Sequence, residues 1–301
     1  MNMTNPIGTT PRAGEPTTLT SRRVKNALFS LLAFAAILIS MVTLAGLLID
    51  LVGRGGSYLD TQFLTSSPSR IPAKAGILPA LVGTLWVTLL VALITFPIGI
   101  GAAIYLEEYA GRGRIARLLK INISNLAGVP SIVYGIFGLA IFVRGLDLGR
   151  TVFAASLTLS LLILPVVIIS SAEALKAVPP SQREAAYALG ATRWQVIRRA
   201  LLPAAAPGIL TGIVLAVGRA VGETAPLILI GAVTFVTFIP TNPFEDKYTV
   251  LPIQIFNWAN RPQEAFLEIS AAAILVLIAL MLLLNGAAIY LRARLSRGLQ
   301  W

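Results

Sequence analysis

The sequence predicts an all-α membrane protein with six transmembrane helices. Of its 301 residues, 56% are hydrophobic and only 12% are charged, whereas about a quarter of an ordinary soluble domain is charged. The apolar residues also lie in long uninterrupted runs, and a helix that crosses a hydrocarbon layer of ~30 Å needs ~20 such residues. A chain with so little polar surface is therefore predicted to be embedded in a lipid membrane.

Six segments are long and apolar enough to cross the membrane. They are roughly residues 27–49, 77–106, 121–143, 151–172, 207–233 and 269–291. The third is the weakest prediction because Asn122, Ser124 and Asn125 make its first half polar. Kinks are expected at the prolines inside the spans, since neighbouring helices can satisfy the carbonyls that a proline frees. These prolines are Pro97, Pro130, Pro165 and Pro226.

The first 26 residues are predicted to be a disordered cytoplasmic tail, and residues 27–301 the transmembrane domain. The tail is rich in Thr, Pro, Gly and Asn, a composition that cannot bury a core. Arg22, Arg23 and Lys25 then precede an apolar run that is longer than the core of a signal peptide. That run is predicted to be an uncleaved first span.

Lysine and arginine predict the orientation. With the N-terminus inside, 16 of the 24 basic residues fall in inner segments and 7 in outer ones, while Arg219 lies within a span. Inner segments of membrane proteins carry this excess of basic residues. Both termini are therefore predicted to be cytoplasmic.

Several kinds of chemistry are excluded by composition. The chain has no Cys and no His, which excludes disulfides, thiol catalysis and imidazole chemistry. It contains no G-x-x-x-x-G-K-[ST] phosphate loop, so no cofactor is expected on this chain and ATP would be used by a partner. The net charge of +11 is spread between apolar runs and does not form the clustered surface of a nucleic-acid-binding protein.

The inner segment 173–206 is too long for a simple connection. Ser181 and Glu184 form an S-x-x-E capping pattern, Gly190 suits a helix C-terminus, and Thr192 with Gln195 repeats the capping pattern. Two short helices joined at Gly190 are predicted, with the second ending at Pro203. A DNA-binding helix-turn-helix has a similar outline, but attachment to the membrane at both ends argues against it.

This segment resembles the EAA motif of ABC importer permeases. The matching residues are Glu184, Ala185, Ala186, Gly190, Leu202 and Pro203, and the departure is Ala200, where the family usually has Ile. The resemblance implies the type I importer fold, and it implies that the two short helices dock on a separate ATPase subunit. Trp194 and Ile197 are the apolar anchors expected on the second helix, beside basic residues.

A second signal is the sequence G-R-A-V-G-E-T-A-P at residues 218–226. Arg219 is expected ~18 Å along a helix that starts near Pro207, close to the bilayer centre. Glu223 lies one turn later, where the two side chains can pair. A charged residue in a span is costly and usually faces a pathway, although a pair that only holds helices together is the alternative.

This second stretch resembles the signature of phosphate-specific permeases, and Arg219, Glu223 and Thr224 are the residues it implies for the substrate pathway. Arginine suits phosphate because its planar fork donates two parallel hydrogen bonds and stays charged. The resemblance implies inorganic phosphate as the substrate and a bacterial inner membrane as the location. It also implies three partners, namely a second, PstC-like permease, two copies of a PstB-like ATPase and a periplasmic, PstS-like phosphate-binding protein.

Three alternatives remain. The chain would be a permease for another oxyanion, such as sulfate or molybdate, if the second resemblance misleads. An ion-coupled secondary transporter would use Arg219 and Glu223 as a relay, but it has no use for the EAA segment. A membrane enzyme is disfavoured because the single carboxylate within the spans leaves too few groups for acid–base or metal chemistry.

Two further features suggest helix contacts and loop anchors. Gly208 with Gly212, and Gly218 with Gly222, are G-x-x-x-G pairs that allow helices to approach closely. The outer segment 237–268 holds aromatic residues that favour anchoring at the membrane interface over docking of a binding protein. These aromatic residues are Phe238, Phe244, Tyr248, Phe256, Trp258 and Phe266.

Overall fold

The computed structural model describes residues 16–111, 113–232 and 235–296, and every regular element in these ranges is helical. The long helices are α1 (Pro16–Gly55), α3 (Leu78–Ile104), α6 (Val152–Lys176), α9 (Leu202–Gly222) and α12 (Glu264–Ser296). The shorter ones are α2 (Thr61–Thr65), α4 (Arg114–Ala127), α5 (Ser131–Gly138), α7 (Pro180–Ala188), α8 (Arg193–Val196), α10 (Ala225–Ile230) and α11 (Leu251–Ala259). Three π-helical segments and two 3-10 turns complete the list: η3 (Tyr105–Tyr109), η4 (Leu139–Gly145), η5 (Ile197–Leu201), η1 (Gly56–Tyr58) and η2 (Pro72–Lys74).

The chain divides into two compact units, Met1–Asp50 and Leu51–Trp301. The first unit consists of most of α1, which begins at Pro16 and therefore includes residues assigned to the tail; residues 1–15 lie outside the described ranges. Its apolar side chains, such as Phe29, Phe34 and Ile49, are exposed. A helix that is apolar on all sides is suited to a lipid environment.

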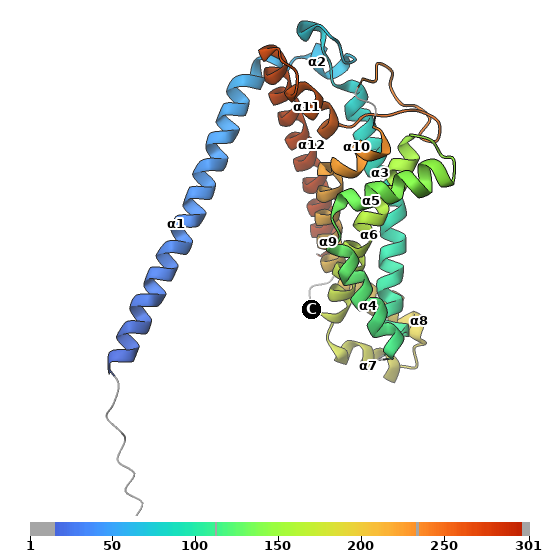
Figure 1. Ribbon diagram of the computed structural model, residues 1–301. Helices are drawn as coiled ribbons and strands as arrows, with labels where there is room; N and C mark the ends of the chain where they lie inside the picture. The colour runs from blue at the N-terminus through green and yellow to red at the C-terminus, as the bar shows by residue number, and fades with distance from the viewer. Residues whose placement is uncertain (1–15, 112, 233–234, 297–301) are drawn as a thin grey trace, which may run out of the picture. The chain divides into compact units, whose positions relative to one another are not determined.

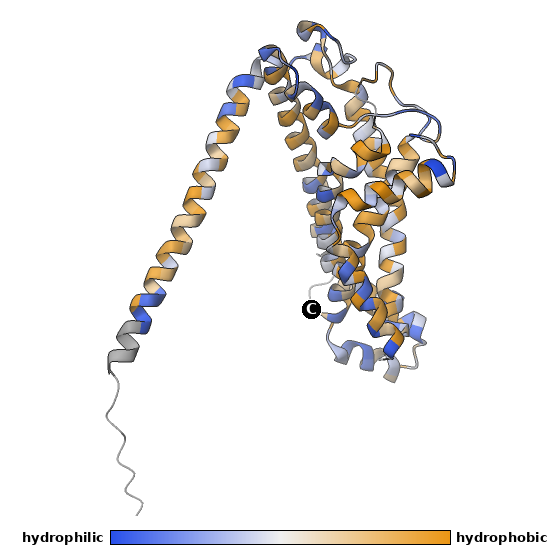
Figure 2. Cartoon of the chain, in the orientation of Figure 1, coloured by the Kyte–Doolittle hydropathy of each residue, from blue (hydrophilic) through white to orange (hydrophobic). Residues whose placement is uncertain are grey.

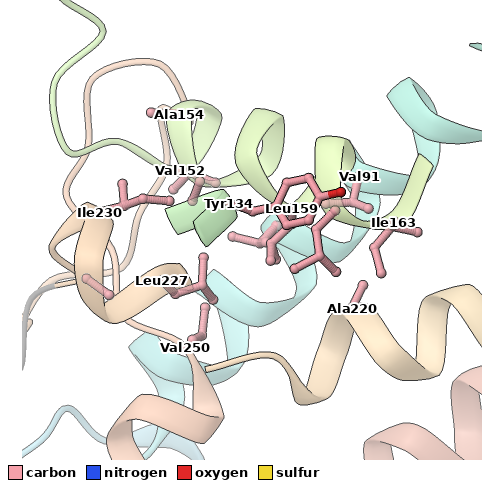
Figure 3. Packing of buried hydrophobic residues seen from close by; sticks show 14 of the residues in the cluster. Val91, Tyr134, Val152, Ala154, Leu159, Ile163, Ala220, Leu227, Ile230 and Val250 are labelled. Carbon is pink, nitrogen blue, oxygen red and sulfur yellow. The ribbon is translucent and has the colours of Figure 1, made fainter. Parts of the chain in front are cut away.

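The second unit is a helical bundle with α6 at its centre (Figure 1). In the most apolar 18-residue stretch of α6, 67% of the residues are buried. The corresponding share is 28% in α3, in α12 and in the helix that contains α9. Helix α6 packs on both α3 and α9, and α12 packs on α9. The largest core cluster joins α6 to its neighbours through Leu159 and Ile163, with Val91, Tyr134 and Ala220 around them (Figure 3).

Within the described ranges, five helices are long and apolar enough to cross a membrane, and there are six crossings if α4 and the α5–η4 helix are one broken span. These two pieces meet at an angle of 99°. Pro130, the N-cap of α5, lies at the break, and a proline disfavours helical backbone in the residue before it. The all-α fold is confirmed, while the count of six spans stays a prediction.

The expected fifth span, residues 207–233, is wrong at both ends. The continuous helix runs from Arg193 to Gly222, so Pro203 does not end it. The helix continues through Pro203 because the turn before it, η5, is π-helical. There the backbone N–H of Leu202 donates to the carbonyl of Ile197, five residues back. At the other end Glu223 takes extended backbone angles (φ −73°, ψ 126°), and α10 starts separately with Pro226 in its first turn.

Glycines bring α9 close to α6. A methyl group on Gly208 would meet Ala174, and one on Gly212 would meet the side chain of Ser170. The first G-x-x-x-G pair is thus confirmed as a close helix contact. The second pair is not, because a methyl group on Gly218 would meet only ordinary contacts and one on Gly222 would meet none.

Three of the six outer aromatic residues belong to the core and are not interfacial anchors, which corrects the prediction for them. Tyr248, Trp258 and Phe266 are fully buried. Trp258 and Phe266 pack with Phe63 from α2 in a second cluster. The outer segment contains the helix α11, and packing α11 against α12 removes the rings of Trp258 and Phe266 from the surface, while Tyr248 belongs to the first cluster.

Candidate functional site

The predicted pathway pair forms at the end of α9. Nε of Arg219 lies 3.2 Å from Oε1 of Glu223, as the one-turn spacing predicts. The arginine side chain is 42% exposed and the carboxylate 15% exposed. Because α9 ends at Gly222, Arg219 lies in the last turn of the continuous helix and not near its middle. The depth of Arg219 in the membrane stays a prediction.

The pair lies at the break between α9 and α10. Helix α10 packs on α5, which follows the break after α4. A methyl group on Gly135 of α5 would collide with the backbone of Pro226, so α5 and α10 are in close contact. Tyr134, which precedes Gly135 on α5, is buried. Its hydroxyl donates a hydrogen bond to the carbonyl oxygen of Leu126, and the two oxygens are 2.8 Å apart. The Thr224 hydroxyl is used locally, since it donates to the carbonyl of Gly222 at 3.4 Å.

The geometry suits an anion. Among the described residues the Arg219 pair uses the Nε atom, which leaves the two terminal nitrogens as donors. These nitrogens form the planar edge that matches two oxygens of an oxyanion. Glu223 pairs with the Nε atom of the guanidinium, which places a carboxylate next to these free donors.

The predicted coupling helices lie at the opposite end of the second unit from α10 and α11 (Figure 1), where the ribbon is predominantly hydrophilic (Figure 2). Gly190 has φ +78° and ends α7, as its predicted role requires. The capping box at α8 forms, with the N–H of Thr192 donating to Oε1 of Gln195 at 2.8 Å. The box at Ser181 and Glu184 does not form, because Pro179 is the N-cap and Ser181 lies inside the helix.

The exposed surface of this end differs from the predicted one in one anchor. Trp194 is 55% exposed, whereas Ile197 is fully buried and is not available to a partner. The turn η5 directs Ile197 into the protein. The sequence analysis did not predict Tyr187 and Leu189 as surface residues, although they are 46% and 89% exposed. The sequence feature that could have indicated them is an apolar residue on each side of Ala188 in an otherwise polar segment.

Two of the remaining residues of the EAA segment, Ala185 and Pro203, line a groove between α7 and the η5–α9 helix. Glu184 and Ala185 are exposed, while Ala186, Leu202 and Pro203 are half-buried. The groove has a volume of about 440 Å³. Its lining consists of Gln182, Ala185, Leu189, Arg199, Ala200, Pro203 and Ala204.

Residues 95–297 match the family model described as "Binding-protein-dependent transport system inner membrane component". The chain belongs to this family. The permease is 36% identical over 288 residues to the phosphate transport system permease protein PstA 1 of Mycobacterium tuberculosis (strain CDC 1551 / Oshkosh), covering 94% of this chain and 93% of the relative. It is 35% identical over 266 residues to the phosphate transport system permease protein PstA of Yersinia pestis, covering 88% of each.

Solved structures confirm the type I fold of the permease. A chain of a bacterial alginate ABC transporter, in complex with a periplasmic protein bound to an alginate pentasaccharide, superposes with a TM-score of 0.65 at 18% identity. The match covers 91% of the permease and 96% of that chain. A chain of the MetNI methionine ABC transporter, in an inward-facing conformation, gives a TM-score of 0.57 at 18% identity, covering 71% and 93%.

Proposed function

We propose that this chain is a permease subunit of an ATP-driven importer and moves inorganic phosphate across the inner membrane. The pair of Arg219 and Glu223 at the end of α9 is the observation that carries the proposal. The names of the Mycobacterium tuberculosis and Yersinia pestis relatives, which match over most of both chains, support phosphate as the substrate.

The chemistry of the pair favours phosphate over other oxyanions. The free edge of Arg219 donates two hydrogen bonds to two phosphate oxygens. Near pH 7 phosphate still carries a proton, so its hydroxyl can donate a hydrogen bond to the Glu223 carboxylate, whereas sulfate has no proton with which to donate. A carboxylate beside the anion therefore disfavours sulfate, because it would only repel it.

The rest of the importer supplies energy and substrate. A PstC-like second permease completes the pore, a PstB-like ATPase dimer docks on α7 and α8, and a PstS-like periplasmic protein delivers phosphate. ATP hydrolysis belongs to the ATPase subunit, and both termini of this chain lie in the cytoplasm. An exposed Trp194 beside Arg193, Arg198 and Arg199 supports the docking surface, and such a surface argues against an ion-coupled carrier.

Replacing Arg219 tests the substrate site. Arg219→Lys keeps the charge but loses the fork, so phosphate uptake is expected to fall at least tenfold in a strain that lacks other phosphate importers. The protein should still be recovered from membranes at the normal level.

The double variant Arg219→Gln with Glu223→Gln separates transport from helix packing. If the pair only holds the helices together, removing both charges restores assembly and uptake together. If Arg219 binds phosphate, assembly recovers and uptake does not. Normal uptake by the double variant would end the assignment of the site and leave the family membership intact.

A further inference from the structure

The cytoplasmic end of α3 is wound as a π-helix. In the segment η3, the backbone N–H of Ala110 donates to the carbonyl of Tyr105 at 2.8 Å, five residues back. Single π turns inside helices are rare and frequently mark functional positions. Here the wide turn carries two adjacent glutamates, Glu107 and Glu108, whose side chains are only 10% and 9% exposed.

Glu107 joins three helices of the bundle. Its Oε1 lies 2.7 Å from Nζ of Lys120 on α4 and 3.9 Å from Nζ of Lys176 at the end of α6. The carboxylate thus links the end of α3 to the middle of α4 and the end of α6.

Glu108 reaches a different element, the first coupling helix. Its Oε1 lies 3.1 Å from Nη2 of Arg183 on α7. The same nitrogen donates to the carbonyl of Leu175 at 3.0 Å, near the C-terminus of α6. Beside this contact, the guanidinium of Arg193 on α8 lies 4.8 Å from the ring centre of Tyr109. Consecutive residues of η3 therefore contact both short cytoplasmic helices.

The two faces of α7 have different surroundings. Glu184, Ala185 and Leu189 are exposed, whereas Arg183 is turned inward and three-quarters buried. A partner can therefore bind the exposed face without disturbing the ion pair. A buried carboxylate that loses its paired cation is strongly unfavourable, so a displacement of α7 is expected to carry the end of α3 with it.

We propose that Glu108 and Arg183 form a mechanical joint that transmits the movement of α7 to α3, and that both act as positioning residues in the transport cycle. The inference rests on the proposed function, because it assumes that an ATPase moves α7. It adds that the movement enters the bundle at η3, where Glu107 extends it to α4 and α6.

Arg183→Gln tests the joint, because Arg183 is partly exposed and tolerates substitution better than Glu108. The complete importer is purified, placed in lipid vesicles with the binding protein and phosphate, and assayed for both ATP hydrolysis and phosphate uptake. The variant is expected to assemble and hydrolyse ATP but to consume at least fivefold more ATP per phosphate moved. Arg183→Lys keeps the cation within reach and should return the ratio to near the wild-type value.

Glu173→Gln is the matched control. It removes an ion pair with Lys176 that lies within α6 and is exposed, so it breaks no link between α7 and α3. Its ratio of ATP to phosphate should equal that of the wild type. Glu108→Gln should reproduce the effect of Arg183→Gln if it assembles.

The outcomes separate the joint from the proposed function. A normal ratio in Arg183→Gln, or an abnormal ratio that Arg183→Lys does not correct, would overturn the joint. A merely structural role would lower the amount of assembled importer and leave the ratio per complex unchanged. Failure of the wild-type importer to move phosphate would instead contradict the proposed function.

Discussion

The absence of a side chain at Gly212 allows α9 to approach α6 closely. A β-carbon there would overlap both side-chain atoms of Ser170. The hydroxyl oxygen can rotate away, but Cβ cannot, because it is attached to the backbone. The same substitution at Gly218 meets only contacts of 3.8 Å or more. The two glycines lie on one helix, so the helix propensity gained by alanine is the same at both.

Gly212→Ala is therefore expected to be less stable than Gly218→Ala. Overpacking typically costs about 1–3 kcal/mol, while the exchange of glycine for alanine in a helix gains up to about 1 kcal/mol at either site. Thermal unfolding of the two variants in the same detergent measures the difference. Equal midpoints would show that α6 moves aside and that the close contact is not needed.

Residue spacing in the sequence was enough to predict the Arg219–Glu223 pair, the left-handed Gly190 and the Thr192–Gln195 cap, because each depends on neighbours within one or two turns. The burial of Ile197 and the contact of Glu108 with Arg183 were not predictable in this way. The first depends on the π turn of η5, and the second joins two helices that are far apart in the sequence.

At the scale of elements, the bend between α7 and α8 depends on the backbone of Gly190. A β-branched residue is strongly disfavoured at φ +78°. Gly190→Val is expected to insert into the membrane normally, while association with the ATPase subunit and phosphate uptake fall together. The measurement is the amount of ATPase that co-purifies with the tagged permease.

Gly113→Val is the control for that bend. Gly113 is the N-cap of α4 with φ −69° and ψ 165°, which any residue adopts, and a methyl group there meets no atom within 4 Å. Association with the ATPase should be unchanged. Normal association of both variants would mean that α7 and α8 form only a connection.

Hydrophobic run length predicted where most helices lie but not where they break. Runs of apolar residues identify α1, α3, α6 and α12 because each is longer than the membrane needs. The interruptions at Pro130 and Glu223 and the continuity through Pro203 depend on backbone geometry and on packing against α6 and α5. Run length alone does not contain that information.

At the scale of the whole molecule, the distribution of basic residues predicts that α7 and α8 face the cytoplasm and that the 237–268 segment faces outward. The permease has no native cysteine, so single cysteines report on each side without background. Leu189→Cys on the coupling end and Glu245→Cys in the outer segment replace exposed residues. Neither is in the pathway pair or the joint.

A membrane-impermeant maleimide added to intact spheroplasts is expected to label Glu245→Cys and not Leu189→Cys. Permeabilised membranes should give labelling of both, which shows that each thiol is reactive once reached. The expectation follows from the excess of lysine and arginine in the segments assigned to the inside, since such segments are retained in the cytoplasm during insertion. Labelling of Leu189→Cys in intact spheroplasts would reverse the orientation and place α7 and α8 out of reach of any cytoplasmic ATPase.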